Sequence, residues 1–263
     1  MSSPIQEKTR QDQIPWERGK FFKAYELMLV EYLVQSVLEN ASGTSLLDIA
    51  CGNGLVTSRL APHFRRVIGL DASSAHLTKA RQDFPHIEFI EGLAEGFVTE
   101  EKFTTITMLN LLEHVADPVA LLQGAKRLLD ESGVLIVNVP NALAVNRRIA
   151  VLMGTLENEH ELSPYDIDVA GHRRYYDLSS LERDVVAAGF RPVKRGGVFY
   201  KALSQAQLNW MLENGPWEAG GFGWGRVGSE HAKDWRKAFC DAAYEFGKQR
   251  PEDCNLIYIV AQV

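Results

Sequence analysis

Residues 46–54 read Leu-Leu-Asp-Ile-Ala-Cys-Gly-Asn-Gly, and this stretch decides the fold. A short apolar run ends in an acidic residue, a small-residue turn with two glycines follows, and a helical pattern extends from Leu55 to Leu60. That order is typical of a strand, a tight loop and a helix. Glycine suits the loop because a backbone without Cβ adopts positive φ and lets a ligand lie against the main chain at the positive end of the helix. The stretch therefore predicts the entry to a nucleotide pocket.

Strand and helix patterns alternate around this stretch as far as Pro140. The predicted strands are 46–48, 67–70, 87–90, 104–109 and 134–139. Ser73 or Ser74 is placed to cap a helix that runs to about residue 84. Asp117 and Pro118 start a helix that runs to about residue 130 before Gly133 ends it. Such alternation requires right-handed crossovers, so the fold class is α/β, a Rossmann-like doubly wound sheet covered on both faces.

The alternation breaks after Pro140, where longer segments separate the predicted elements. We expect a helix over 141–154, a polar irregular stretch over 155–171 and a helix with a Ser179 and Glu182 capping box that reaches Ala188. A sixth strand is expected over 191–200 and a Gly/Trp-rich stretch over 215–228. A helix over about 229–247 and a seventh strand over 255–263 complete the chain. The seventh strand is apolar enough to lie inside the sheet. The sheet is therefore predicted to be seven-stranded and mostly parallel.

The chain is expected to form one structural domain with three parts. Residues 1–40 form an N-terminal helical cap, because apolar residues recur at helical spacing over 16–40, and residues 41–141 form the cofactor-binding core. Residues 142–263 complete the sheet and carry insertions at 142–178 and 201–254, of which the C-terminal one is expected to act as a substrate lid. For the Gly/Trp-rich stretch, a mobile flap and a static loop fit equally well.

Composition and charge limit the classes of partner. The 263 residues are 46% hydrophobic with a net charge of −6, so there is no general attraction to phosphate backbones, and a small molecule is favoured over nucleic acid. Cys51, Cys240 and Cys254 form no CxxC pair, which disfavours structural zinc and a disulfide framework. No apolar run approaches the roughly 18 residues that span a bilayer. We expect a cytoplasmic monomer or homodimer with no membrane partner and no export signal.

The predicted strand ends carry the informative residues, because a ligand of an open parallel sheet lies outside the carboxyl ends of the strands. They are Asp48 with Gly52 and Gly54, Asp71, Gly92 to Ala94, and Asn110 to His114. Asp71 lies 17 residues beyond Gly54, about where an acidic side chain accepts hydrogen bonds from both hydroxyls of a ribose. This set fits any adenosine cofactor.

Charge discriminates between the possible adenosine cofactors. A dinucleotide site needs a third glycine where this chain has Thr57, and Asp48 would lie poorly beside a dianionic pyrophosphate. Asp48 is better placed for a cation, and S-adenosylmethionine carries an ammonium and a sulfonium. An NAD-dependent oxidoreductase is therefore the less favoured alternative.

Four segments in order resemble one family. LLDIACGNG, Asp71, EGLAE at 91–95 and NLLEHV at 110–115 with its following Asp-Pro resemble class I S-adenosylmethionine-dependent methyltransferases, particularly the small-molecule group that includes ubiquinone-biosynthesis O-methyltransferases. The resemblance is strong over about 46–141. It implies Asp48, Gly52, Asn53 and Gly54 around the methionine moiety, Asp71 on the ribose, Ala72 and Leu93 flanking adenine, and Asn110 with Leu111 beneath the sulfonium. Ala50, Gly92 and Ala94 complete the predicted set of cofactor-binding residues.

The segment around His114 is the predicted catalytic part. His114, with Glu113 beside it, is a candidate general base, because it follows the fourth strand and its ordinary pKa suits proton removal. Alternatively, His114 only orients the loop. Some quinone methyltransferases bind a metal through several glutamates and a histidine, whereas this chain keeps only Glu113 and His114 and has Asn110 and Leu112 at neighbouring positions. Two adjacent candidate ligands make a poor site, so we expect no catalytic metal.

The acceptor is expected to meet residues from the added segments. The candidates are Tyr25 or Lys23, His172, Arg173, Arg174, Tyr175, Tyr176, Tyr200, Lys201 and Gln205. A fork-shaped cation beside aromatic rings is suited to an acceptor that carries a carboxylate or phosphate. The plainer alternatives are a solvated surface pair at 173–174 and ordinary strand-end polarity at 200–205. A protein that binds S-adenosylmethionine without turnover is the further functional alternative.

Overall fold

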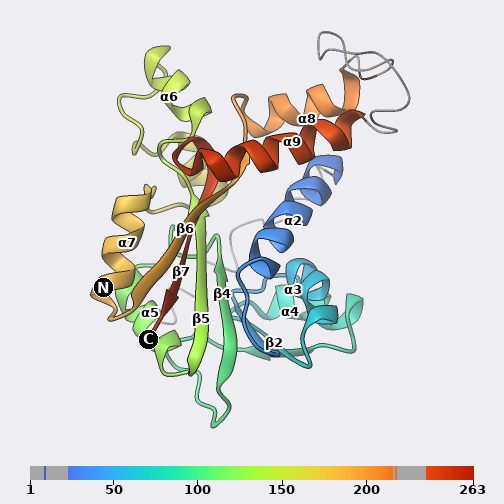
Figure 1. Cartoon of the computed structure of the whole chain (residues 1–263), viewed down its shortest axis with the longest axis vertical. Helices are drawn as coiled ribbons and strands as arrows, with labels where there is room; N and C mark the ends of the chain where they lie inside the picture. Colours follow the sequence, from blue (N-terminus) through green and yellow to red (C-terminus); the bar gives the residue numbers. More distant parts are fainter. Residues whose placement is uncertain (1–8, 10–22, 216, 218–234) are drawn as a thin grey trace.

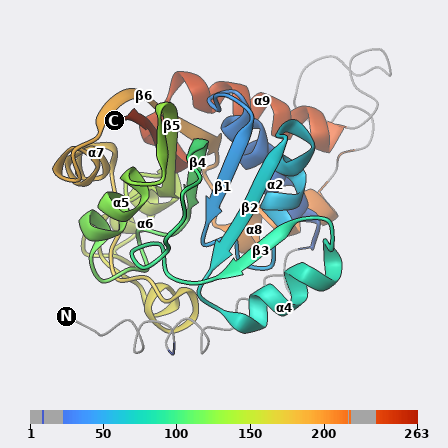
Figure 2. The same cartoon turned by 90° about the horizontal axis from the view of Figure 1, so that it is seen from below.

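The computed structural model describes residues 9, 23–215, 217 and 235–263. Within these residues the chain forms a seven-stranded sheet of order β3-β2-β1-β4-β5-β7-β6 (Figures 1 and 2). The strands are β1 Ser45–Ile49, β2 Arg66–Asp71, β3 Glu88–Glu91, β4 Phe103–Leu109, β5 Leu129–Pro140, β6 Arg191–Tyr200 and β7 Cys254–Gln262. The first five strands pair in parallel, and β7 pairs antiparallel with both β5 and β6. The predicted mostly parallel sheet is confirmed, with the seventh strand in its interior.

The order of the strands reverses between β1 and β4. The chain runs outward from β1 to β2 and β3 and then returns to the other side of β1 as β4. Figure 2 shows β3, β2, β1, β4 and β5 beside one another in that order. Loops that leave the carboxyl ends of β1 and β4 therefore diverge, which is where an open sheet of this class binds its ligand.

Helices cover both faces of the sheet. They are α2 Lys23–Leu38, α3 Leu55–Leu60, α4 Ser74–Asp83, α5 Pro118–Lys126, α6 Val145–Leu152, α7 Leu178–Ala187, α8 Gln205–Asn214 and α9 Trp235–Gln249, with short turns η2 Ala61–His63, η3 Asp166–Ala170 and η4 Pro251–Asp253. Successive strand residues point to opposite faces, so Ile136 packs with α2 and α9, and Val137 packs with α5 and α7. Among the described residues, no helix combines the length and apolarity that crossing a membrane requires.

The boundaries of α5 and α7 differ from those expected, and α6 covers only Val145–Leu152 of the helix expected over 141–154. The helix α5 ends at Lys126 and β5 already begins at Leu129, so Gly133 lies within the strand and does not end a helix. A Cβ at Gly133 would lie 3.0 Å from the carbonyl oxygen of Phe103, and this close approach of β4 explains the glycine. The helix α7 is capped by Asp177 and Ser180, not by Ser179 and Glu182, because Asp177 accepts the hydrogen bond of the Ser180 amide at 2.7 Å.

The C-terminal insertion is more helical than expected. Residues 205–214 form α8, which begins with a Ser204 and Gln207 capping box that the sequence interpretation missed. The Gly/Trp-rich stretch falls, apart from Gly215 and Trp217, outside the described residues. The predicted lid over the substrate therefore stays a prediction.

Gly54→Ala is expected to destabilise the protein by about 2–4 kcal/mol. Gly54 has φ 76°, and a Cβ there would lie 2.7 Å from the Phe89 ring, so alanine combines left-handed strain with overpacking. Urea unfolding measures the loss. Gly154→Ala is the matched control, since Gly154 has φ 72° but no heavy atom within 4 Å of the added Cβ. Equal losses in the two variants would contradict the packing argument.

Candidate functional site

Two residues with left-handed backbone turn the chain at the ends of β1 and β4. Ala50, with φ 61°, is the first residue after β1, and Asn110, with φ 53°, is the first after β4. Such conformations cost of order 1–3 kcal/mol for residues other than glycine and concentrate at functional sites. Because β1 and β4 are neighbours, both turns open onto the same edge of the sheet.

Asp48 lies within the end of β1 and is 2% exposed. Its carboxylate accepts hydrogen bonds from Thr57 Oγ1 at 2.6 Å and from Thr107 Oγ1 at 2.8 Å. Burial raises the pKa of Asp48 to about 6, because desolvation outweighs both hydroxyl hydrogen bonds. Thr57, at the position where a dinucleotide site has its third glycine, is thus one of the two residues that hold Asp48.

Asp48→Asn is expected to stabilise the ligand-free protein at pH 8. The pKa of the buried carboxyl lies above its ordinary value of 3.8, so the folded chain keeps a proton that the unfolded chain releases, and stability falls as the pH rises from about 4 to about 6. Above that window, ionisation costs on the order of 3 kcal/mol, which a neutral amide avoids. Urea unfolding at pH 5 and pH 8 measures the free energy of unfolding of the variant and of the wild type. A difference in favour of Asp48→Asn that does not grow from pH 5 to pH 8 would contradict the prediction.

Asp71 connects the glycine loop to the end of β2. Its carboxylate accepts hydrogen bonds from the amides of Gly52 and Ser73, each at 2.8 Å. Gly52 has φ 55°, and no heavy atom lies within 4 Å of the position a Cβ would take. The loop therefore presents an open backbone surface beside Asp71, whose side chain is 10% exposed.

The predicted adenine-binding residues lie at the end of β3. The Gly92 amide donates to the Asp71 carbonyl at 2.9 Å, which places the loop after β3 against β2. Leu93 and Ala72 are half-buried, and Asn53 is exposed. Ala94 is 3% exposed and packs in the hydrophobic core, so its side chain is not available to a ligand.

Asn138 is a buried polar residue near the same edge that the sequence interpretation missed. The Asn110 amide donates to its carbonyl at 2.8 Å, and its side chain is 1% exposed without a hydrogen-bond partner among the described residues. Its signal in the sequence is an amide that interrupts the apolar run Val-Leu-Ile-Val before Val139. Leu111, predicted beneath the sulfonium, is half-buried against the core.

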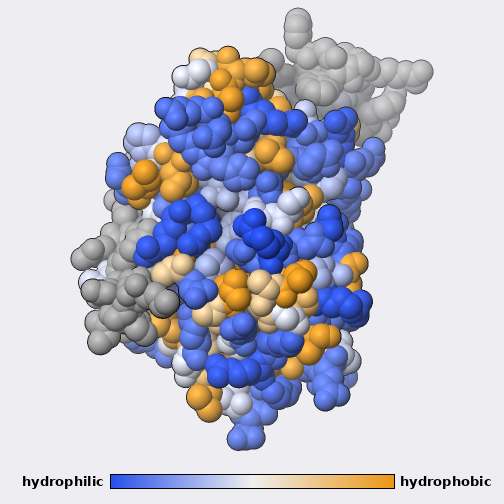
Figure 3. Space-filling model, turned by 90° about the vertical axis from the view of Figure 1, so that its left-hand side faces the viewer, coloured by the Kyte–Doolittle hydropathy of each residue, from blue (hydrophilic) through white to orange (hydrophobic). Residues whose placement is uncertain are grey.

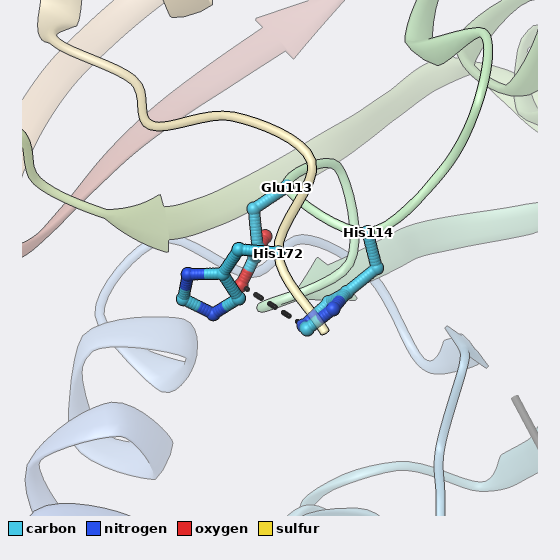
Figure 4. Close-up of side chains that lie close together, drawn as sticks. All are labelled: Glu113, His114 and His172. Carbon is cyan, nitrogen blue, oxygen red and sulfur yellow. Dashed lines mark ion pairs between the residues drawn. The ribbon is translucent and has the colours of Figure 1, made fainter. Parts of the chain in front are cut away.

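Glu113 and His114 meet His172 in a buried cluster (Figure 4). The exposed fractions of the Glu113 and His114 side chains are 1% and 3%, and that of His172 is 11%. His114 Nε2 lies 3.6 Å from Glu113 Oε1, and the two imidazole rings are 5.0 Å apart between centroids. The candidate acceptor residue His172 is thus brought to the candidate catalytic residues by the fold.

Arg147 and Asp166 form a buried ion pair next to His172. Asp166 Oδ1 lies 3.9 Å from His172 Nδ1 and accepts the Tyr175 hydroxyl at 2.9 Å. Arg147 Nη1 lies 3.5 Å from Asp166 Oδ2, and its guanidinium stacks over the Tyr175 ring at 3.7 Å. Tyr175 therefore supports the cluster, and its hydroxyl is bonded to Asp166.

The ion pair also explains the orientation of α6. Arg147 points into the protein and is 8% exposed, whereas Leu152 and the adjoining Met153 are 88% and 69% exposed. Apolar side chains gather at the top of the face in Figure 3, the end of the molecule that carries α6 in Figure 1. The inward face of this helix is thus held by charge and hydrogen bonds, and part of its apolar surface faces outward.

Three predicted acceptor residues make structural contacts within the fold, and their binding of an acceptor stays a prediction. Arg174 donates to the carbonyls of Leu112, Val115 and Ala116, and Arg173 donates through Nε to the His114 carbonyl at 2.8 Å. Guanidinium groups used in this way stabilise the loop after β4 and leave fewer donors for an anion. Tyr176 is 2% exposed in the core, with its hydroxyl on Asp184.

The end of β6 supplies the remaining described candidates. The Tyr200 ring stacks edge-on against Phe246, with centroids 4.9 Å apart. Lys201 follows directly and is 6% exposed, and burial lowers its pKa to about 8. Lys23 and Tyr25 lie in α2 and Gln205 in α8, but their side chains are outside the described structure.

Comparison with known proteins places the chain in a family. A family profile described as a methyltransferase domain matches residues 23–195. The ubiquinone biosynthesis O-methyltransferase of Dinoroseobacter shibae is 28% identical over 65% of this chain and 68% of its own length. A probable S-adenosylmethionine-dependent methyltransferase of Mycolicibacterium smegmatis is 25% identical over 77% of this chain and 76% of its own. The ubiquinone biosynthesis O-methyltransferase of Actinobacillus pleuropneumoniae is 30% identical over 48% of this chain, and the match spans 59% of that relative's own length.

Solved structures share the fold across nearly the whole chain. A methyltransferase from Thermotoga maritima, described as a possible histamine N-methyltransferase, matches with a TM-score of 0.57 and 18% identity over 91% of this chain and 93% of its own. A Mesorhizobium loti methyltransferase matches with the same TM-score of 0.57 and 15% identity over 91% of this chain and 100% of its own. The chain therefore belongs to the class I S-adenosylmethionine-dependent methyltransferases, and S-adenosylmethionine is its cofactor.

Proposed function

We propose that this chain transfers the methyl group of S-adenosylmethionine to a hydroxyl of a small-molecule acceptor. The observation that carries the proposal is the hydrogen bond from the Gly52 amide to the Asp71 carboxylate, at 2.8 Å. It joins the loops at the ends of β1 and β2, beside the point where the strand order reverses, and no heavy atom lies within 4 Å of the position that a Cβ of Gly52 would take. A carboxylate next to an exposed backbone turn suits a ribose and a cationic amino-acid moiety.

The cofactor is assigned to the loops after β1, β2, β3 and β4. Asp48, Ala50, Gly52, Asn53 and Gly54 surround the methionine moiety, Asp71 receives the ribose hydroxyls, Ala72 with Gly92, Leu93 and the Ala94 backbone flank adenine, and Asn110 and Leu111 lie beneath the sulfonium. Ionised Asp48 attracts the ammonium group through the loop.

The acceptor is assigned to the side of Glu113 and His114. In the transfer, the acceptor oxygen bonds to the methyl carbon, the carbon–sulfur bond breaks with its electron pair going to sulfur, and the hydroxyl proton passes to a base, a role assigned to the pair of Glu113 and His114. Holding the reactants in line supplies on the order of 7–11 kcal/mol. A hydroxyl acceptor gains from groups that assist loss of its proton, whereas a neutral amine does not need them. A buried carboxylate–histidine pair supports a hydroxyl, as do the names of the ubiquinone O-methyltransferase relatives.

An anionic group on the acceptor is assigned to Lys201. Its ammonium is buried at the end of β6, which runs parallel to β5 because both strands pair antiparallel with β7. The carboxyl end of β6 therefore lies at the same edge of the sheet as that of β4. A buried lysine binds a carboxylate or phosphate strongly, because the attraction is little screened by water.

Calorimetry and mass spectrometry test the proposed function. We expect S-adenosylmethionine and S-adenosylhomocysteine to bind with 1:1 stoichiometry and NAD not to bind. A cell extract incubated with the protein and isotopically labelled S-adenosylmethionine is expected to yield a labelled methyl ether. Binding of NAD without S-adenosylmethionine would overturn the assignment. Cofactor binding with no labelled product from a broad metabolite panel would favour a non-catalytic binding protein.

A further inference from the structure

We propose that Glu113, His114 and His172 form a binding site for a divalent cation of the zinc type, on the acceptor side of the pocket. The placement beside the acceptor rests on the proposed function, whereas the site itself rests on the geometry of three side chains. The sequence offers only Glu113 and His114 as adjacent ligands, which is why no metal is expected from it. The fold adds His172 from the segment that follows η3.

The donor atoms of the three side chains converge. One ligand atom from each residue lies within 4.8 Å of the other two, with Glu113 and His114 buried and His172 partly buried. Figure 4 shows the Glu113 carboxylate between the two imidazole rings, with its oxygen directed at His114 Nε2. Two histidines and one carboxylate are the ligand set of catalytic zinc sites, in which the fourth position is left for water or substrate.

An oxygen atom lies near Nδ1 of each histidine, within hydrogen-bond distance for His114 and at ion-pair distance for His172. His114 Nδ1 lies 3.3 Å from the Gly171 carbonyl oxygen, and His172 Nδ1 lies 3.9 Å from Asp166 Oδ1. Histidines that ligate a metal almost always direct the other ring nitrogen at a carbonyl or carboxylate, which fixes the tautomer and raises the basicity of the ligand nitrogen. With its proton on Nδ1, His114 presents the lone pair of Nε2 toward Glu113.

The two segments that carry the ligands are tied to each other. The Arg173 amide donates to the Glu113 carbonyl at 2.7 Å, and Arg173 Nε donates to the His114 carbonyl at 2.8 Å. Asp166 is held in turn by Ser163 and Arg147. Rigid support of this kind keeps ligand atoms near a binding geometry before the ion arrives.

The ligand types select the class of cation. Imidazole nitrogen suits zinc, cobalt and nickel, whereas magnesium prefers an all-oxygen octahedron and keeps several waters. The site is therefore expected to prefer Zn²⁺ and Co²⁺ to Mg²⁺. A cation held there by Glu113, His114 and His172 would supply Lewis acidity, which would lower the pKa of a bound hydroxyl.

Metal titration of the full chain, stripped with a chelator, tests the site. We expect Co²⁺ to give visible ligand-field absorption that saturates at one ion per chain, Zn²⁺ to displace it, and a large excess of Mg²⁺ not to. His172→Ala and Glu113→Gln are each expected to weaken Zn²⁺ binding at least about 100-fold, and Asp166→Asn about 10–100-fold. His160→Ala is the matched control, because His160 is 45% exposed and pairs with Asp177 instead.

Cofactor affinity separates this site from the proposed function. The variants are expected to bind S-adenosylmethionine as the wild type does, which also shows that they are folded. Absence of saturable Co²⁺ binding, equal Zn²⁺ binding by His172→Ala and wild type, or equal competition by Mg²⁺ would each overturn the metal site, even if methyl transfer were observed. Failure of the wild type to bind S-adenosylmethionine would overturn the proposed function, whatever the metal titration showed.

Discussion

Asp71→Ala is expected to lower the affinity for S-adenosylmethionine at least about 100-fold, a loss of about 2.7 kcal/mol. Two effects add. The variant loses the carboxylate assigned to the ribose hydroxyls, and hydrogen bonds to a charged group contribute roughly 1.5–3 kcal/mol each. It also removes the acceptor of the Gly52 and Ser73 amides, which join the loops after β1 and β2. Isothermal titration calorimetry measures the affinity.

Asp83→Ala provides the control for Asp71. Asp83 ends α4, its side chain is 40% exposed, and its carboxylate pairs with Lys79 at 2.9 Å on the surface. We expect its replacement to leave cofactor affinity within about twofold, because an exposed helical pair contributes only about 0.3–0.5 kcal/mol. The cofactor affinity of Asp71→Asn should lie between those of Asp71→Ala and the wild type, since an amide keeps one acceptor oxygen. An Asp71→Ala protein with wild-type affinity would show the ribose assignment to be wrong.

His114→Ala is expected to lower kcat about 10²–10⁴-fold while the dissociation constant of S-adenosylmethionine is unchanged. His114 is assigned to the acceptor side and lies 3.6 Å from the Glu113 carboxylate with 3% exposure, so its loss removes a general base or, with a cation bound, a metal ligand that assists loss of the hydroxyl proton. Turnover with the acceptor found by mass spectrometry gives kcat, and calorimetry gives the cofactor affinity.

The His114 prediction has its own control. His86 is exposed between α4 and β3, so His86→Ala should leave both measurements unchanged. Unaltered kcat in His114→Ala would show that this histidine only orients the loop. A parallel loss of cofactor affinity would instead place His114 on the donor side.

The helix-strand order was predictable because its signals are local. The stretch from Leu46 to Gly54 specifies a strand, a loop and the start of a helix through residues that are close together in the sequence. The helix α3 spans Leu55–Leu60 as expected. Asp117 caps α5 as expected, and of the two candidates Ser73 and Ser74 it is Ser73 that caps α4, each through its own side-chain oxygen. The boundaries that were wrong, at Gly133 and Asp177, depend on the neighbouring strand and on a competition between adjacent caps.

The residues of the candidate site were likewise predictable only where their signals are local in the sequence. Asp48, Asp71 and Glu113 could be named from the sequence because each stands at or near the end of a predicted strand, and parallel strands end at one edge. The roles of Arg174 and Tyr176 could not be assigned, because nothing near them in sequence indicates that one binds the carbonyls of the loop after β4 and the other binds Asp184.

By itself, the sequence determined the α/β class, the glycine loop and the acidic residues at the ends of β1 and β2, since these follow from periodicity, capping and turn chemistry over a few residues. Only the tertiary structure decided that Thr57 and Thr107 hold Asp48, and that His172 joins Glu113 and His114 with Asp166 behind it. These contacts join segments that are distant along the chain, and they form only when the sheet brings its strand ends to one edge.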